Sequence, residues 1–202
     1  MKKLIIASLA LAMLFGCKKG ENDPGISFRS RDARIVGEWK IGSFEKESKT
    51  VDINYTGNPA VLTTKTKVAA TMYDGSKVTV TTTNAGTTKV TTDTVTYAYS
   101  LNIEKDGNCT FIETASKGGV TSTYTSKGTW LWANSKKNKS FVNFNFTDIS
   151  PSNLFSSGLY RIDQLKNKEM VLISNDYDND ETTSKAGTST ENTNTSKFTF
   201  TQ

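Results

Sequence analysis

The sequence contains no histidine among its 202 residues. This absence removes the usual general base of hydrolytic triads and the commonest nitrogen ligand of zinc. A pair of carboxylates could still cleave a glycoside, but we expect the two glutamates on predicted strands, Glu38 and Glu113, to lie on the surface. We therefore expect no enzymatic activity, no catalytic residue, no metal site and no cofactor.

Proline is also scarce, with three residues in the chain, and no window carries a sustained apolar stripe of helical period. After residue 39 the chain is rich in Thr, Val and Tyr, which favour strands. Turn signals recur at Asp74-Gly75, Asn84-Ala85-Gly86, Asp106-Gly107 and Gly118-Gly119. This spacing predicts sequential hairpins in an all-β, antiparallel up-and-down β-barrel of about 8–10 strands, because closing a meander removes its exposed edges.

The longest apolar run, residues 4–15, is too short to span a membrane as a helix and follows the basic start Met1-Lys2-Lys3. The next residues complete Leu14-Phe15-Gly16-Cys17, which resembles the lipobox of bacterial lipoproteins. The resemblance implies cleavage before Cys17 and acylation of that cysteine. Two or three acyl chains would then hold the protein on a membrane without a spanning segment.

This interpretation divides the chain into three parts. Residues 1–16 are the lipoprotein signal peptide, residues 17–33 are the lipidated cysteine with a charged, flexible tether, and residues 34–202 are the barrel domain. At the end of the tether, Ser30 is placed to cap a short helical turn. Lys18 stands directly after the cysteine. In enteric-type sorting, an Asp at this position would favour retention in the inner membrane. We therefore expect the outer membrane, facing either the periplasm or the cell surface.

Cysteine and net charge are both low. With Cys17 lipidated, Cys109 is the remaining cysteine, so no intramolecular disulfide can form, and we expect Cys109 to be a small apolar residue.

Removing Lys2 and Lys3 lowers the formal charge from +5 to +3, and a net charge this small does not indicate nucleic-acid binding. The basic cluster Lys136-Lys137-Asn138-Lys139 predicts a solvated hairpin tip. We expect a monomer.

A family resemblance begins at Gly37-Glu38-Trp39, which resembles the Gly-x-Trp signature at the first strand of lipocalins and bacterial lipocalin-like domains. Gly128-Thr129-Trp130 resembles the second such strand, and residues 101–111 and 160–173 resemble the central and late hairpins. Residues 47–96 depart from the pattern, because they are longer and richer in Thr than such domains need. The extra hairpins there could extend past the barrel.

Alternation of apolar residues indicates which side chains face inward. The resemblance implies that Trp39 plugs the closed end of the barrel, whereas Trp132 is expected nearer the open end if it lines a cavity. The inward-facing aromatic residues either line a ligand cavity or fill the barrel, and filling is favoured. These candidates are Trp39, Tyr97, Tyr99, Tyr124, Trp130, Trp132, Phe144, Phe146, Phe198 and Phe200.

Three polar segments complete the sequence. Residues 78–96 predict a solvated hairpin at the barrel mouth, and Asp93-Thr94-Val95 within it resembles a short O-glycan acceptor pattern that would modify Thr94. Residues 176–181 carry alternating carboxylates but fail the calcium-loop pattern twice, at Glu181 and Gly187, which favours an acidic loop. Residues 182–196 predict a long mobile loop.

The leading functional hypothesis is a membrane-anchored protein of the cell envelope that binds a small apolar or amphipathic ligand without catalysis. The alternative is a structural or interaction protein with a solidly packed barrel, acting through its Thr-rich loops.

Overall fold

The computed structural model describes residues 30–56, 61–84, 87–133, 139–148, 151, 154–180 and 188–202. No helix in this part of the chain is long and apolar enough to cross a membrane. Its elements, in chain order, are α2 (Arg31–Ile35), β1 (Gly37–Thr56), β2 (Val61–Tyr73), β3 (Val78–Asn84), β4 (Thr87–Thr92), β5 (Thr96–Ile103), β6 (Asn108–Lys117), β7 (Val120–Trp132), β8 (Phe141–Phe146), β9 (Gly158–Leu165), β10 (Glu169–Asp180) and β11 (Thr188–Thr201).

Eight of these strands close into the predicted antiparallel barrel. Neighbours in the ring follow chain order from β5 to β11, and β1 closes the ring by pairing with both β11 and β5. Every pairing is antiparallel, as expected for successive hairpins. The all-β, up-and-down barrel predicted from the turn signals is therefore confirmed, and it is consistent with a lipocalin-like fold.

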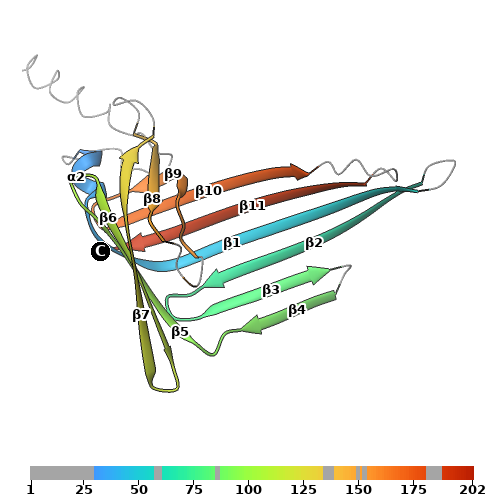
Figure 1. Ribbon diagram of the computed structural model, residues 1–202, viewed down its shortest axis with the longest axis horizontal. Coiled ribbons are helices and arrows are strands. Elements are labelled where there is room, and N and C mark those ends of the chain that lie inside the picture. The colour runs from blue at the N-terminus through green and yellow to red at the C-terminus, as the bar shows by residue number, and fades with distance from the viewer. Residues whose placement is uncertain are drawn as a thin grey trace, which may run out of the picture.

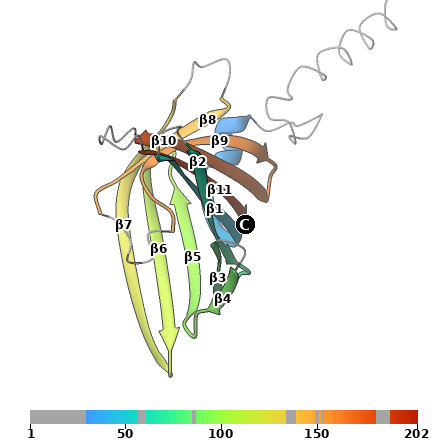
Figure 2. The ribbon, with the colours of Figure 1, turned by 90° about the vertical axis from the view of Figure 1, so that its right-hand side faces the viewer.

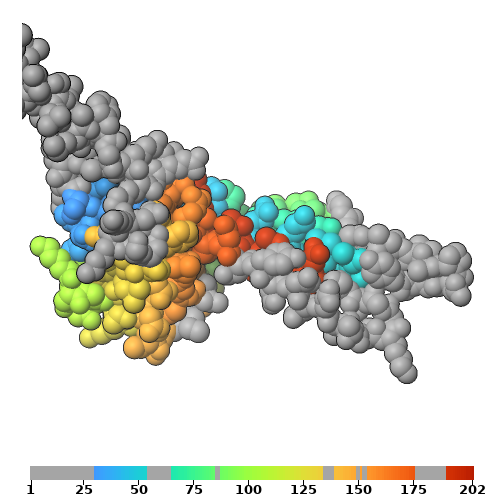
Figure 3. Space-filling view, turned by 90° about the horizontal axis from the view of Figure 1, so that it is seen from above, coloured from blue at the N-terminus to red at the C-terminus, as the bar shows by residue number. Residues whose placement is uncertain are grey.

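Strand β1 belongs to the barrel and also to a long extension of it. Its first residues, Gly37 to Lys40, pair with β5, whereas the stretch from Phe44 to Thr56 pairs with β2. The strands β2, β3 and β4 therefore leave the ring and form, with β1 and the distal parts of β10 and β11, a sheet that we call the arm (Figures 1 and 3). The hairpins of residues 47–96 thus extend past the barrel.

The arm includes two segments whose sequence predictions are wrong. Residues 188–196, from the mobile loop expected over 182–196, lie in β11 between β1 and β10. Residues 176–180, from the acidic loop expected over 176–181, lie in β10, and residues 181–187 are outside the described residues. Pairing on both sides satisfies the backbone of β11. Hydroxyl groups add cross-strand bonds on one face: Ser48 Oγ donates to Asn194 Oδ1 at 2.7 Å and Thr50 Oγ1 to Asn192 Oδ1 at 3.0 Å. The polar side chains of this segment therefore form a ladder of cross-strand hydrogen bonds.

Strands β5, β6 and β7 form a second extension, which we call the wall, and it leaves the barrel in a different direction from the arm (Figure 2). The two extensions are joined beside the barrel, where β1 no longer pairs with β5. There Tyr73 Oη donates to the carbonyl of Tyr97 at 3.0 Å, and the Tyr97 N–H donates to the Ser76 carbonyl at 2.7 Å. Because β8 and β9 are short, the barrel opens between arm and wall, and we call this opening the mouth.

Helix α2 marks the opposite, closed end. Ser30 Oγ accepts from the Ala33 N–H at 3.2 Å, which confirms the predicted capped turn. Arg31, Arg34 and Ile35 are buried in this helix, and the Arg34 guanidinium donates to the Leu165 carbonyl at the end of β9. The helix is therefore fixed to the barrel by a buried cation that satisfies a strand-end carbonyl.

Candidate functional site

The centre of the barrel is filled by aromatic side chains, as the sequence favours. Phe155, from the segment between β8 and β9, is 2% exposed and lies with its ring centroid 4.9–5.9 Å from six other rings. Contacts at this separation add to the apolar burial. The six rings belong to Phe111, Phe144, Phe146, Tyr160, Phe198 and Phe200. Phe155 therefore acts as a plug between the barrel interior and the mouth.

Sequence reasoning missed this plug because Phe155 lies outside any alternating run. Its segment is held in place by polar contacts of the two serines that follow the ring: Tyr160 Oη donates to the Ser156 carbonyl at 2.8 Å, and Ser157 Oγ accepts from the Phe146 N–H at 2.8 Å. The available signal was a large apolar residue, Phe155, in a segment otherwise rich in Ser. Such a residue has no strand partner and must find burial elsewhere.

The two Gly-x-Trp motifs both lie toward the closed end. Trp39 is fully buried and its Nε1–H donates to the Ile35 carbonyl at 2.8 Å, so this indole joins β1 to helix α2. Trp130 donates from Nε1 to the Glu104 carbonyl at 2.7 Å. Steric constraints explain why each motif has glycine at its first position. Gly37 has φ +142°, and a Cβ at Gly128 would meet the Asn145 carbonyl oxygen at 2.3 Å.

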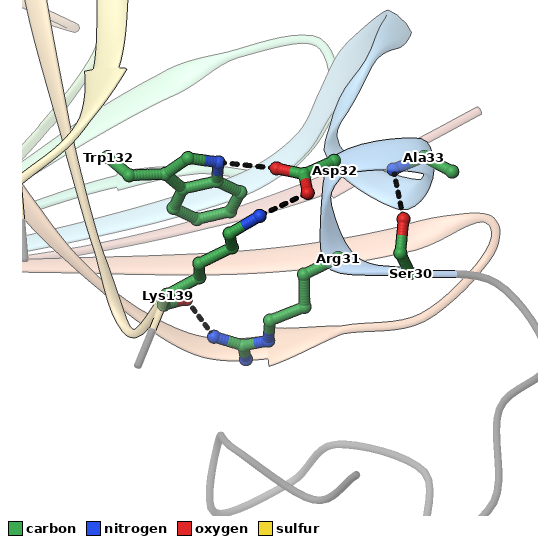
Figure 4. A network of polar contacts seen from close by, with 6 residues as sticks. All are labelled: Ser30, Arg31, Asp32, Ala33, Trp132 and Lys139. Carbon is green, nitrogen blue, oxygen red and sulfur yellow. Dashed lines mark hydrogen bonds and ion pairs between the residues drawn. The ribbon is translucent and has the colours of Figure 1, made fainter. Parts of the chain in front are cut away.

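Trp132 lies at the closed end as well, which corrects the expectation that it is nearer the mouth. Its Nε1–H donates to Asp32 Oδ1 of α2 at 2.8 Å, and Lys139 forms an ion pair with the same carboxylate (Figure 4). The Lys139 ammonium also lies 5.6 Å from the Trp132 ring centroid, and its carbonyl accepts from Arg31. Lys139 is therefore bound to α2, whereas the sequence predicts that it lies in a solvated hairpin tip. Residues 134–138 of that turn lie outside the described residues.

At the other end, the inner face of the wall carries a pocket of about 730 Å³. This volume lies within the range of ligand sites in proteins. The lining continues the inward-facing rows of β5, β6 and β7 beyond the Phe155 plug, because Glu113 pairs with Tyr124 and Tyr97 with Ala115. Its lining residues are Val95, Tyr97, Glu113, Ala115, Lys117, Val120, Ser122, Thr123, Tyr124 and Pro151.

Glu113 corrects a prediction, because it is 4% exposed and not on the surface; Glu38 is exposed as expected. The alternation of β6 places Glu113 on the same face as the buried Cys109 and Phe111. Lys117 follows on that face and is exposed at the end of the strand. The pocket therefore combines apolar and tyrosine surface with a carboxylate at depth and an ammonium at its rim.

The Tyr97 hydroxyl is fixed at one side of this pocket. It donates to Asp93 Oδ2 at 2.9 Å, while Asp93 Oδ1 accepts from the Val95 N–H at 3.0 Å. Burial and this hydrogen bond raise the pKa of Tyr97, and the Val95 N–H together with Tyr97 lowers the pKa of Asp93. At neutral pH the phenol is therefore a donor to a carboxylate. Thr94 is exposed in the same turn, and its glycosylation stays a prediction.

Cys109 is buried in the core, at 1% exposure, consistent with the small apolar role expected for it. Burial, with a smaller contribution from Glu104, raises the pKa of its thiol to about 11. A thiol with this pKa is protonated at neutral pH and is a poor nucleophile. In the described residues, no three side chains of the His, Cys, Asp and Glu types are grouped so that they could hold a metal ion.

The structure separates the candidate aromatic residues into three places. Trp39, Trp130 and Trp132 lie toward the closed end, and Tyr97 and Tyr124 line the mouth pocket. The barrel interior holds Tyr99, Phe144, Phe146, Phe198 and Phe200. No family model, no curated protein and no solved structure matches the chain. The assignment of the site therefore depends on its geometry.

Proposed function

We propose that this protein is a lipid-anchored protein of the cell envelope that binds an amphipathic ligand, without catalysis, in the pocket at the mouth of its barrel. The observation that carries the proposal is the position of this pocket beyond the Phe155 plug, with Tyr97 and Tyr124 flanking the buried Glu113. The packed interior favours binding at the mouth over binding along the barrel axis. An outer-membrane location, from the residues around Cys17, completes the proposal.

The chemistry of the lining supports an amphipathic ligand. Val95, Ala115 and Val120 offer apolar surface, and the tyrosine rings can stack on a flat or extended apolar group. Glu113 and Lys117 are the charged members of the lining, and they can orient a polar end group. No histidine is present to serve as a general base, which favours binding over turnover.

Replacing Tyr124 with alanine should weaken binding of the neutral fluorescent probe N-phenyl-1-naphthylamine by about tenfold, or ~1.4 kcal/mol. The substitution removes one aromatic wall of the pocket from a half-buried position on β7. Fluorescence titration of the folded protein measures the dissociation constant. The matched control is Trp132→Ala, at the closed end, which should leave the affinity unchanged.

Failure of this titration would favour the second candidate function. If the unsubstituted protein shows no saturable probe binding, the barrel is a structural or interaction module that acts through its arm, as the polar, Thr-rich faces of β3 and β4 would suggest. If Trp132→Ala and Tyr124→Ala weaken binding equally, the ligand does not occupy the mouth pocket.

Replacing Cys17 with serine should release the protein from membranes, because acyl chains would be its hydrophobic attachment after cleavage. Cys17 and residues 1–29 lie outside the described residues, so this prediction comes from the sequence alone. Fractionation of cells into soluble and membrane parts is the measurement. Cys109→Ala is the control and should stay membrane-bound, since Cys109 is buried in the barrel. A Cys17→Ser chain that stays fully with the membrane would contradict the anchor.

A further inference from the structure

The outermost strand of the arm, β4, presents an open edge. In the part of the chain that the structure describes, β4 pairs with β3 and with no other strand. All six of its residues are exposed, and the Val90 side chain is 62% exposed. An edge of this kind offers a row of backbone donors and acceptors to another strand.

The hydrogen-bonding pattern identifies which groups of β4 face outward. The Asp93 N–H donates to the Val78 carbonyl at 2.9 Å, in line with the register that pairs Thr92 with Thr79. In an antiparallel ladder, bonded pairs alternate with unbonded ones. The odd-numbered residues of β4 therefore bond to β3, and the N–H and C=O groups of Thr88, Val90 and Thr92 point to the open edge.

The edge is regular and carries little charge. No register shift interrupts the β3–β4 pairing, and the hydroxyl groups of Thr79 and Thr92 lie 3.3 Å apart, with a second such pair at Thr83 and Thr88. Lys89 is the one charged residue in the strand.

We propose that β4 pairs with β4 of a second copy of this chain, in an antiparallel register centred on Val90. Two-fold symmetry allows either an odd or an even residue at the centre. Only even residues present outward backbone groups, and Val90 is the central one of the three. This register places Thr88 opposite the partner's Thr92, so that each of these pairs can exchange both backbone bonds.

Side chains support a second copy as the occupant. The exposed Val90 side chain would meet the partner's Val90, which buries apolar surface on both chains. Lys89 would lie opposite the partner's Thr91, whereas a register centred on Lys89 would set the two ammonium groups directly opposite each other. The segment Thr88-Lys89-Val90-Thr91-Thr92 has a threonine at each end. A partner strand that runs in the opposite direction therefore places a threonine opposite each of these threonines. The dimer replaces the monomer expected from the sequence.

Cysteine crosslinking tests the register directly. A bonded antiparallel pair has a Cα separation of about 5.5 Å, within the range that a disulfide spans. Val90→Cys, in the otherwise unaltered full chain, should therefore give a disulfide-linked dimer under mild oxidation, beyond any background from the unsubstituted protein. The matched control is Val120→Cys, at 73% exposure at the first residue of β7, which should give no such dimer. Equal crosslinking of both variants, or crosslinking of Val90→Cys to a different protein, would overturn the proposal.

A proline substitution tests the backbone bonds. The Val90 N–H points away from β3, so Val90→Pro removes a bond to the partner and none within the chain, and edge strands accept proline at such positions. We expect Val90→Pro to reduce dimer association about tenfold or more in sedimentation of the purified full chain, with unchanged circular dichroism. Val120→Ser, the control, should leave the dimer intact. A monomeric unsubstituted protein, or a dimer that survives Val90→Pro, would overturn the proposal.

Discussion

Replacing Trp39 with alanine is expected to destabilise the domain by about 3–5 kcal/mol. The indole is fully buried, and its Nε1–H satisfies the Ile35 carbonyl at the end of α2. Truncation would therefore leave a cavity under the closed end and an unpaired carbonyl. A loss of this size is a large share of the stability of a typical domain. Denaturant melting followed by circular dichroism measures it.

Trp132→Ala is the matched comparison for Trp39→Ala. Trp132 is half-buried and bonds to an exposed carboxylate, so the same substitution should cost less than Trp39→Ala. Leu131→Ala, at 54% exposure on the same strand, should change the stability by less than about 0.5 kcal/mol. If Trp39→Ala and Trp132→Ala gave equal, small losses, Trp39 would not be a structural plug.

Replacing Phe155 with alanine should cost roughly 3–5 kcal/mol and also create a binding site inside the barrel. Its ring lies among six aromatic neighbours, so truncation would leave an apolar cavity lined by their faces. Cavities of this kind stay dry and accept small apolar molecules. We expect benzene to raise the melting temperature of Phe155→Ala and to have no such effect on the unsubstituted protein.

Leu159→Ala is the control for Phe155→Ala, because Leu159 is 54% exposed on the neighbouring strand β9. It should keep nearly full stability and show no benzene effect. A loss below about 1 kcal/mol for Phe155→Ala, with no benzene response, would mean that the barrel centre does not depend on this ring. Probe affinity at the mouth, measured on the same variant, would then indicate whether Phe155 also forms the floor of the pocket.

The barrel could be predicted from the sequence because its determinants are local. Gly-containing turns and alternating aromatic residues, such as Phe198 and Phe200, define strands and their inward faces within a few residues. The burial of Tyr99, Phe144 and both of these phenylalanines follows the predicted rows. These features need no knowledge of distant parts of the chain.

The β10 and β11 part of the arm and the Phe155 plug could not be predicted, because they depend on distant partners. Asn192 and Asn194 look like loop residues in the sequence, and their place in a strand becomes clear only when Thr50 and Ser48 lie opposite them. Phe155 likewise depends on the meeting of several strands around one ring. The charge of Glu113 favours the surface, although the alternation of β6 places it on the same inward face as Phe111.

The pairing of β1 with β11 also has a consequence for folding kinetics. It joins Lys40 to Thr201, so the first strand of the ring cannot complete its pairing until the last strand of the ring has formed. A ring closed by residues so distant in sequence has a high contact order, which slows folding. Until β11 is present, β1 and β10 both have unpaired edges, and such edges invite aggregation. The barrel therefore cannot close until the strand that ends at Thr201 is in place.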